Sequence, residues 1–121
     1  MIRAVLLVDH GSRRAEANEQ LEALAAMLRT RLPDRLVVTA HLEVVPPNVG
    51  EGIEACVDAG ATEVVVHPFF LAPGRHTSED IPRQVAAATD RHPGLSIRIS
   101  QPLGLHDRLL DVVIERIESS G

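Results

Sequence analysis

The sequence predicts a three-layer α/β/α fold around a four-stranded parallel sheet. Short runs of β-branched and aliphatic residues alternate along the chain with longer segments in which apolar residues recur at helical spacing. The short runs are apolar at almost every position, which is typical of strands that helices cover on both faces. With right-handed crossovers between the strands, the usual winding of such a sheet has the strand order 2-1-3-4.

The expected strands are short segments bounded by glycine, proline or aspartate: residues 3–9, 36–44, 62–71 and 95–99. Helical periodicity follows each strand, over residues 21–32, 49–57, about 78–92 and 109–117. Expected helix N-caps are Ser12, Asn48, and Thr77 or Ser78, and expected stops are Gly60 and the segment His92-Pro93-Gly94. Gly50 and Gly52 each cost up to ~1 kcal/mol inside the second helix, so we expect that helix to start late or to be irregular.

The chain has the length of one domain. At 121 residues and 13.1 kDa it can bury one hydrophobic core, and we expect a single domain over residues 1–121, so that a crevice with two lobes needs a second copy. The apolar runs are far shorter than the roughly 20 residues that span a bilayer, and the N-terminal segment does not resemble a secretory signal. Cys56 is the only cysteine, which excludes a disulfide within the chain. These features predict a cytoplasmic protein without a membrane segment.

The charge and the aromatic content disfavour nucleic acid as a partner. The formal net charge is -5, and the chain has two Phe, no Trp and no Tyr on which bases could stack. All 12 basic residues are arginine, whose guanidinium binds carboxylates and phosphates in a two-pronged geometry. Local clusters of arginine can therefore bind an anion although the chain is acidic overall.

Candidate functional residues lie where the expected strands end. His10 follows the first strand and is succeeded by Gly11, at a tight turn, and by Ser12. Glu43 ends the second strand, and His76 follows the third. In the order 2-1-3-4 these three strands are adjacent, so His10, Glu43 and His76 can converge on one point at the carboxyl ends of the sheet, where such folds bind ligands.

Two imidazoles and one carboxylate suit a first-row divalent metal and leave coordination positions open for a substrate. Each residue alone also has an ordinary reading. His10 is consistent with a helix cap, His76 with a solvated loop residue, and Glu43 with a surface charge. Their convergence at the mouth of one crevice favours function for the three together.

Three arginines and four further histidines have their own interpretations. Arg13, Arg14 and Arg75 flank His10 and His76 and predict a basic crevice for an anionic ligand, although Arg14 is equally consistent with a solvated first helical turn. Among the remaining histidines, we expect His41 and His67 either to pack in the interior or to hydrogen-bond to residues of the site. We expect His92 to be structural, and the sequence assigns no role to His106.

Four segments together resemble a known family. LLVDHGSRRAEAN, LEVVPPN, HPFFLAPGRHTSEDIP and QPLGLHDRLLDVV look like the short form of the CbiX-type sirohydrochlorin chelatases, and the similarity covers nearly the whole chain. HGSR followed by GxHxxxDIP at this separation is the specific part. Asp9 stands where many members have a glycine, which leaves the metal preference open.

The resemblance implies a chelatase-like fold, a homodimer in place of the two lobes of larger chelatases, and metal handling by His10 and His76. A glutamate of related chelatases is best matched by Glu43. Gly11, Ser12, Arg13 and Arg75 are the expected contacts of the tetrapyrrole, with Phe69, Phe70, Leu71 and Pro73 as an apolar wall, although core packing is an equal or better reading for Leu71 and the two phenylalanines.

The resulting hypothesis is an enzyme that inserts Co²⁺, or Fe²⁺, into sirohydrochlorin for cobalamin or siroheme biosynthesis, with Ni²⁺ as a further candidate metal. We expect no use of ATP, because the chain has no phosphate-cradling glycine loop. The alternative is a metal or tetrapyrrole carrier with the same site and no turnover. A histidine phosphatase is set aside, because Asp9 occupies the place where that chemistry needs an arginine.

Overall fold

The fold is an open parallel sheet flanked by helices. The computed structural model describes residues 1–72, 74 and 77–121, except for the side chains of residues 77 and 78. Its strands are β1 (Ile2–Asp9), β2 (Arg35–His41), β3 (Ala61–Pro68) and β4 (Ser96–Ile99). All neighbouring strands are parallel and their order is β2-β1-β3-β4, which confirms the predicted winding.

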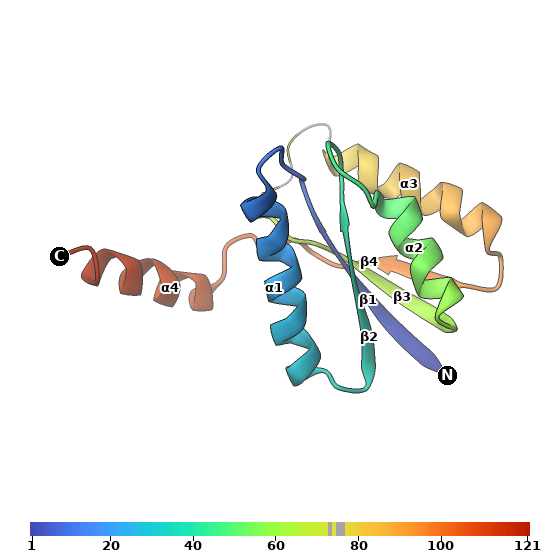
Figure 1. The fold of residues 1–121 in the computed structure, drawn as a ribbon, viewed down its shortest axis with the longest axis horizontal. Coiled ribbons are helices and arrows are strands. Elements are labelled where there is room, and N and C mark those ends of the chain that lie inside the picture. The colour runs from blue at the N-terminus through green and yellow to red at the C-terminus, as the bar shows by residue number, and fades with distance from the viewer. Residues whose placement is uncertain (73, 75–76) are drawn as a thin grey trace.

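Three helices cover the sheet. α1 (Ala15–Arg31) lies on one face, whereas α2 (Val49–Asp58) and α3 (Thr77–Arg91) lie on the other (Figure 1). The larger core lies under α2 and α3 and includes Leu6, Val8, Ile53 and Val66, none of which is solvent-accessible. The smaller core lies under α1, where Leu7 of β1 packs with neighbouring apolar side chains of β1, β2 and α1. Burial on both faces explains why the strands are apolar at successive positions.

α2 begins immediately after its cap and is regular, so the expectation of a late or irregular start was wrong. Asn48 and Glu51 form a reciprocal capping box, which satisfies the first backbone donors of the helix. Gly52 is required by packing, because a Cβ there would lie 2.7 Å from Leu6 Cδ1. The glycine allows α2 to approach the sheet closely, and this contact offsets its low helix propensity.

The start of α1 also differs from the expectation. The N-cap is Arg14, which makes no side-chain capping bond, and Ser12 lies two residues earlier. Ser12 Oγ accepts a hydrogen bond from the Arg14 backbone N–H, so the serine organises the turn before the helix. The backbone N–H of Ser12 donates to Asn18 Oδ1, and the Asn18 side chain donates back to the Ser12 carbonyl. These bonds tie the turn to the first turn of α1.

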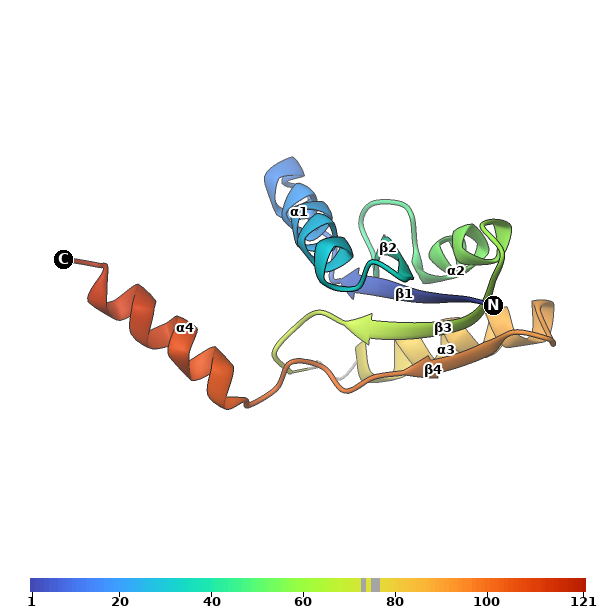
Figure 2. The ribbon, with the colours of Figure 1, turned by 90° about the horizontal axis from the view of Figure 1, so that it is seen from below.

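The last helix, α4 (Asp107–Glu118), stands apart from the sheet. Figures 1 and 2 show it projecting away from the rest of the fold at the end of an extended segment. None of its residues is buried, and it has no extensive contact with another helix or strand in the described part of the chain. No helix among the described residues has both the length and the hydropathy needed to cross a membrane.

Candidate functional site

The candidate site lies at the carboxyl ends of β1, β2 and β3. His10 directly follows β1 and is exposed, and its ring stacks on Phe70 with the ring centroids 4.6 Å apart and the planes 29° from parallel. Phe70 follows β3, so the two rings come from the two strands between which the winding reverses. The stacking restricts the orientation of the imidazole while its edge remains open to solvent.

Glu43 lies beside His10 on the neighbouring strand. β2 ends at His41, but the chain continues next to β1, with Leu42 N–H donating to the Asp9 carbonyl at 2.8 Å and Glu43 N–H donating to the His10 carbonyl at 3.1 Å. The Glu43 side chain is exposed, as is that of His10. The structure therefore brings together these two predicted site residues through their backbones. The third, His76, lies outside the described residues, as do Arg75 and Pro73.

Gly11 is required by the close approach of these two segments. Its φ is +88°, in the left-handed region, and a Cβ at this position would lie 2.0 Å from the Glu43 carbonyl oxygen. Only glycine combines this backbone conformation with the contact. The role of Gly11 in the structure is thus to hold the loop after β1 against the chain that carries Glu43.

A hydrogen-bonded pair lies behind His10. Asp9 and His41 are paired in register at the ends of β1 and β2, and His41 Nδ1 lies 2.6 Å from Asp9 Oδ1. The same carboxylate oxygen accepts a 3.0 Å hydrogen bond from the Gly11 backbone N–H. Because the His41 side chain is buried, the pair fixes the turn that presents His10. The sequence alone gave Asp9 and His41 separate roles. Their positions at the ends of strands expected to be adjacent were the signal that could have predicted the hydrogen bond between them.

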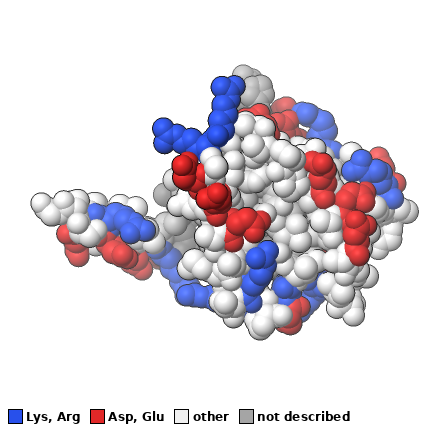
Figure 3. Space-filling model, in the orientation of Figure 1, with Lys and Arg blue, Asp and Glu red and all other residues white. Residues whose placement is uncertain are grey.

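The arginines of the HGSRR segment are exposed. Arg13 and Arg14 lie between the turn and α1, and Figure 3 shows basic side chains projecting from the molecule near the start of this helix. Acidic side chains follow along α1 in the same view. The exposed Arg13 and Arg14 thus place positive charge near the end of the sheet that carries His10.

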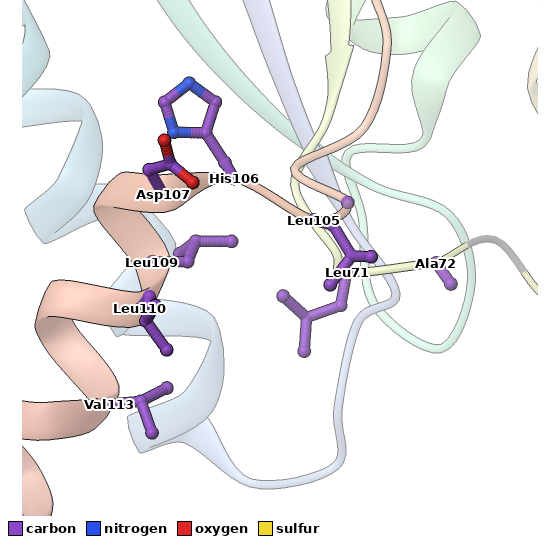
Figure 4. A pocket seen from close by; sticks show the side chains of 9 residues that line it. Leu71, Ala72, Leu105, His106, Asp107, Leu109, Leu110 and Val113 are labelled. Carbon is purple, nitrogen blue, oxygen red and sulfur yellow. The ribbon is translucent and has the colours of Figure 1, made fainter.

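An apolar hollow lies next to the site. It has a volume of about 630 Å³ and lies between the segment after β3 and the first turns of α4 (Figure 4). Its lining residues are mostly aliphatic: Leu71, Ala72, Gly104, Leu105, His106, Asp107, Leu109, Leu110 and Val113. Leu71 adjoins Phe70 and is 63% exposed, so its side chain is a wall residue and not part of the core. Phe69 and Phe70, in contrast, pack partly against the two cores.

The remaining histidines have structural partners. His67 Nδ1 lies 2.7 Å from Ser100 Oγ, and burial lowers the pKa of His67, with a hydrogen bond to the Gln101 backbone acting in the opposite direction. His92 Nε2 lies 2.7 Å from Glu54 Oε1 and joins the end of α3 to α2, in agreement with its structural reading. His106 is the N-cap of α4 and accepts from the Arg108 N–H. Burial also raises the pKa of Cys56 to about 11, as expected for a core thiol.

Within the described ranges, no three His, Cys, Asp or Glu side chains are placed to hold a metal ion together. His10 and Glu43 alone supply one nitrogen and one oxygen donor, which is an incomplete set for a tightly bound structural ion.

The fold and the site define an α/β protein with an exposed histidine and glutamate at the switch point of a 2-1-3-4 sheet, beside an apolar hollow. The family model described as CbiX matches residues 4–120, so the chain belongs to the CbiX family.

Individual relatives agree with this assignment. A chloroplastic sirohydrochlorin ferrochelatase from Arabidopsis thaliana is 45% identical over 94% of this chain and 51% of its own length. A sirohydrochlorin cobaltochelatase from Sulfolobus acidocaldarius is 32% identical over 96% of this chain and 90% of its own length. The chain therefore spans about half the length of several curated relatives, and nearly all of another.

A solved structure gives the same result for the fold. The sirohydrochlorin chelatase SirB from Bacillus subtilis subspecies spizizenii, in complex with cobalt, is 31% identical. It superimposes with a TM-score of 0.91 over 99% of this chain, which corresponds to 51% of the SirB chain. The chain thus has the fold of about half of a longer chelatase.

Proposed function

We propose that this protein inserts a divalent metal ion into sirohydrochlorin, as the names of its relatives state for those proteins. The observation that carries the proposal is the side-by-side placement of the exposed His10 and Glu43 in a chain that matches the CbiX family over residues 4–120. The apolar hollow next to Phe70 supports a flat, largely apolar ligand, and the exposed arginines before α1 support one that carries carboxylates.

In the proposed reaction, a metal dication replaces the two protons on the pyrrole nitrogens of the macrocycle. Glu43 is positioned to attract the cation, since its carboxylate is exposed and lies next to the His10 backbone. The His10 imidazole suits both ligation of the ion and acceptance of a pyrrole proton near neutral pH. We assign His76 the same two roles from the GxHxxxDIP motif alone. Arg13 and Arg75 pair with substrate carboxylates in this proposal, and Gly11 and Ser12 shape the turn.

We place Co²⁺ first as the metal, with Fe²⁺ as the other candidate and Ni²⁺ third. Nitrogen and oxygen ligands follow the common affinity order of divalent ions, in which iron, cobalt and nickel are neighbours. The relatives include both ferrochelatases and cobaltochelatases. Parallel insertion assays with the three metals under anaerobic conditions decide among them, and with that result the choice between cobalamin and siroheme biosynthesis.

We also propose that the reaction proceeds without ATP. A phosphate-binding loop of the common type requires a lysine, and all basic residues of this chain are arginine. Formation of metal–nitrogen bonds is the driving force of the reaction. Insertion that is unchanged when ATP is added or withheld supports this part of the proposal, and a strict ATP requirement contradicts it.

We further propose that two copies form the active unit. A tetrapyrrole is wide compared with the end of one four-stranded sheet, and the chain matches about half of SirB. A second copy would supply the facing wall of the crevice.

The decisive experiment measures metallated sirohydrochlorin produced by catalytic amounts of protein, above the spontaneous rate. We expect His10→Ala and His76→Ala each to remove most turnover, and the double variant to cost little more than either single variant, because groups that act as a unit are not additive. Glu43→Gln is expected to lower turnover while keeping the shape of the side chain. His92→Ala is the control, because His92 follows α3 and its partner is Glu54 of α2.

Two outcomes contradict the proposal. Stoichiometric capture of metal or tetrapyrrole without turnover would identify a carrier. Nearly full activity of His10→Ala with saturating metal and tetrapyrrole would remove the site from the reaction.

A further inference from the structure

A strained turn lies directly after Glu43. The Val45 N–H donates to the Glu43 carbonyl at 3.0 Å, so the turn is centred on Val44, and the φ of Val44 is +77°. A hydrogen bond between residues two apart, around a central residue with this φ, makes a classic γ-turn, which is rare and strained. A β-branched residue is poorly suited to positive φ. Among the non-glycine residues that the structure describes, only Val44 has positive φ, so the strain is local to this turn.

The surrounding bonds hold this turn in place. At its base, the His41 N–H donates to the Pro47 carbonyl at 2.8 Å. On its β1 side, the Glu43 N–H donates to the His10 carbonyl, and the Glu43 carbonyl lies against Gly11, where a Cβ would be 2.0 Å away. Strained residues persist where the neighbouring structure over-determines their conformation, and they cluster at functional sites. The loop after β2 meets the first condition, and its position beside His10 agrees with the second.

The Val44 side chain contributes little to the fold. It is 58% exposed and belongs to neither of the two cores. A glycine at this position would adopt the same backbone conformation without the steric cost. The free-energy cost of the valine is therefore not offset by burial within the described structure. An apolar contact with a ligand would offset it.

Val44 and Leu71 follow strands on opposite sides of β1. Val44 follows β2, His10 follows β1 and Leu71 follows β3, in the strand order β2-β1-β3. Leu71 is 63% exposed and lines the apolar hollow (Figure 4). Neighbouring strands are about 4.8 Å apart, so β2 and β3 are separated by about 10 Å. The two exposed aliphatic side chains thus come from the two sides of the strand that carries His10, as the two walls of a crevice for a flat ring would.

We propose that Val44 is a substrate-binding residue that forms the second apolar wall of the crevice, facing the wall that Leu71 provides. The ligand class is a flat, largely apolar ring that lies over His10. The γ-turn fixes Val44 next to Glu43, so the residue that contacts the ring and the residue that attracts the ion are held together. This inference rests on the proposed function and adds to it a residue that determines how tightly the ring is bound.

Three substitutions at Val44 separate a contact with the ring from a role in the fold. Val44→Thr keeps the branched shape and the backbone strain but replaces an apolar methyl group with a hydroxyl. Val44→Ile keeps both the strain and the apolar character. Val44→Gly removes the side chain and the strain together. A contact with the ring and a role in the fold therefore predict different orders of the variants.

We expect the KM for sirohydrochlorin to rise roughly three- to ten-fold in Val44→Thr and Val44→Gly, from the loss of one or more apolar methyl contacts. Val44→Ile should keep the wild-type KM. In Val44→Thr, kcat and the KM for the metal ion should change little, because a contact made equally in the ground and transition states affects only the binding of the ring. Urea unfolding should show Val44→Gly to be the most stable protein of the series, so stability and affinity for the ring change in opposite directions.

Equilibrium binding of metal-free sirohydrochlorin, followed by its absorbance, separates this inference from the proposed function. We expect Val44→Thr to weaken this binding by the same factor by which it raises the KM. Val112→Thr is the matched control, since Val112 is 45% exposed on α4 and does not line the hollow. It should bind the ring like the wild-type protein.

The outcomes distinguish the two proposals. If the wild-type protein inserts metal and Val44→Thr binds the ring as tightly as wild type, the contact at Val44 is wrong and the proposed function stands. A higher KM in Val44→Gly alone would assign the effect to the freed backbone and would also overturn the contact. If the wild-type protein binds the ring but inserts no metal, the proposed function is wrong, and weaker binding by Val44→Thr still supports the contact. If the wild-type protein does not bind the ring, both are wrong.

Discussion

Replacement of Gly11 by alanine is expected to destabilise the protein and to displace Glu43. The left-handed conformation at φ +88° costs an alanine roughly 1–2 kcal/mol. The new Cβ would also lie 2.0 Å from the Glu43 carbonyl oxygen, so that oxygen must withdraw by about 1 Å to reach even a 3.0 Å contact. Loss of the adjacent hydrogen bond from Glu43 to His10 adds roughly 0.5–1.5 kcal/mol, for a total of roughly 1.5–3.5 kcal/mol.

Two other glycines separate backbone strain from the steric contact. Gly60 has φ +96°, but its Cβ would meet only the flexible end of Ile2 at 3.2 Å, so Gly60→Ala is expected to cost roughly 1–2 kcal/mol. Gly94 has no atom within 4 Å of its Cβ position. Gly94→Ala is therefore expected to change stability by less than about 1 kcal/mol and in the stabilising direction.

Urea unfolding followed by far-UV circular dichroism measures the series, since the chain has no Trp or Tyr for fluorescence. Metal insertion by folded Gly11→Ala should fall well below that of Gly60→Ala, because only the first substitution moves Glu43 relative to His10. Equal losses of stability for Gly11→Ala and Gly60→Ala would refute the steric part of the reasoning.

Three further results are expected. Asp9→Ala should cost roughly 1.5–3 kcal/mol, because it leaves the buried His41 unpaired, and a double-mutant cycle with His41→Ala by urea unfolding should show a coupling of more than about 0.5 kcal/mol. Val44→Gly should stabilise by roughly 0.5–1 kcal/mol in the same assay, because Val44 has φ +77° and is exposed, so relief of strain outweighs the added chain entropy; a loss of stability would contradict this. The pKa of His67 is lowered in the folded protein, so the unfolded chain takes up a proton at this histidine at a higher pH than the folded chain does. The free energy of unfolding should therefore fall as the pH drops below the ordinary value of 6.5, and it should fall less in His67→Gln; thermal unfolding at two pH values tests this.

The sequence alone determined the class of fold, because its signals are local. Apolar strands, helical periodicity and the Asn48 cap are properties of neighbouring residues, and they predicted the strand order that the structure shows. The placement of His10 and Glu43 at adjacent strand ends followed from that order. The resemblance over the quoted motifs added the family, which the match over residues 4–120 confirms.

Tertiary structure alone decided the features that depend on contacts between distant residues. Gly52 is unfavourable in a helix by propensity, and only its distance to Leu6 explains why a glycine is needed there. A glycine is needed at position 11 because the carbonyl of Glu43, which is far away in sequence, lies against it. The Asp9–His41 bond needs the register of β1 and β2. The same periodicity that predicted α4 also predicts a helix packed on its own sheet, but in the structure the helix projects away from the sheet (Figure 2). Periodicity records that a face must be buried, but the surface that buries it is set by the path of the chain in space.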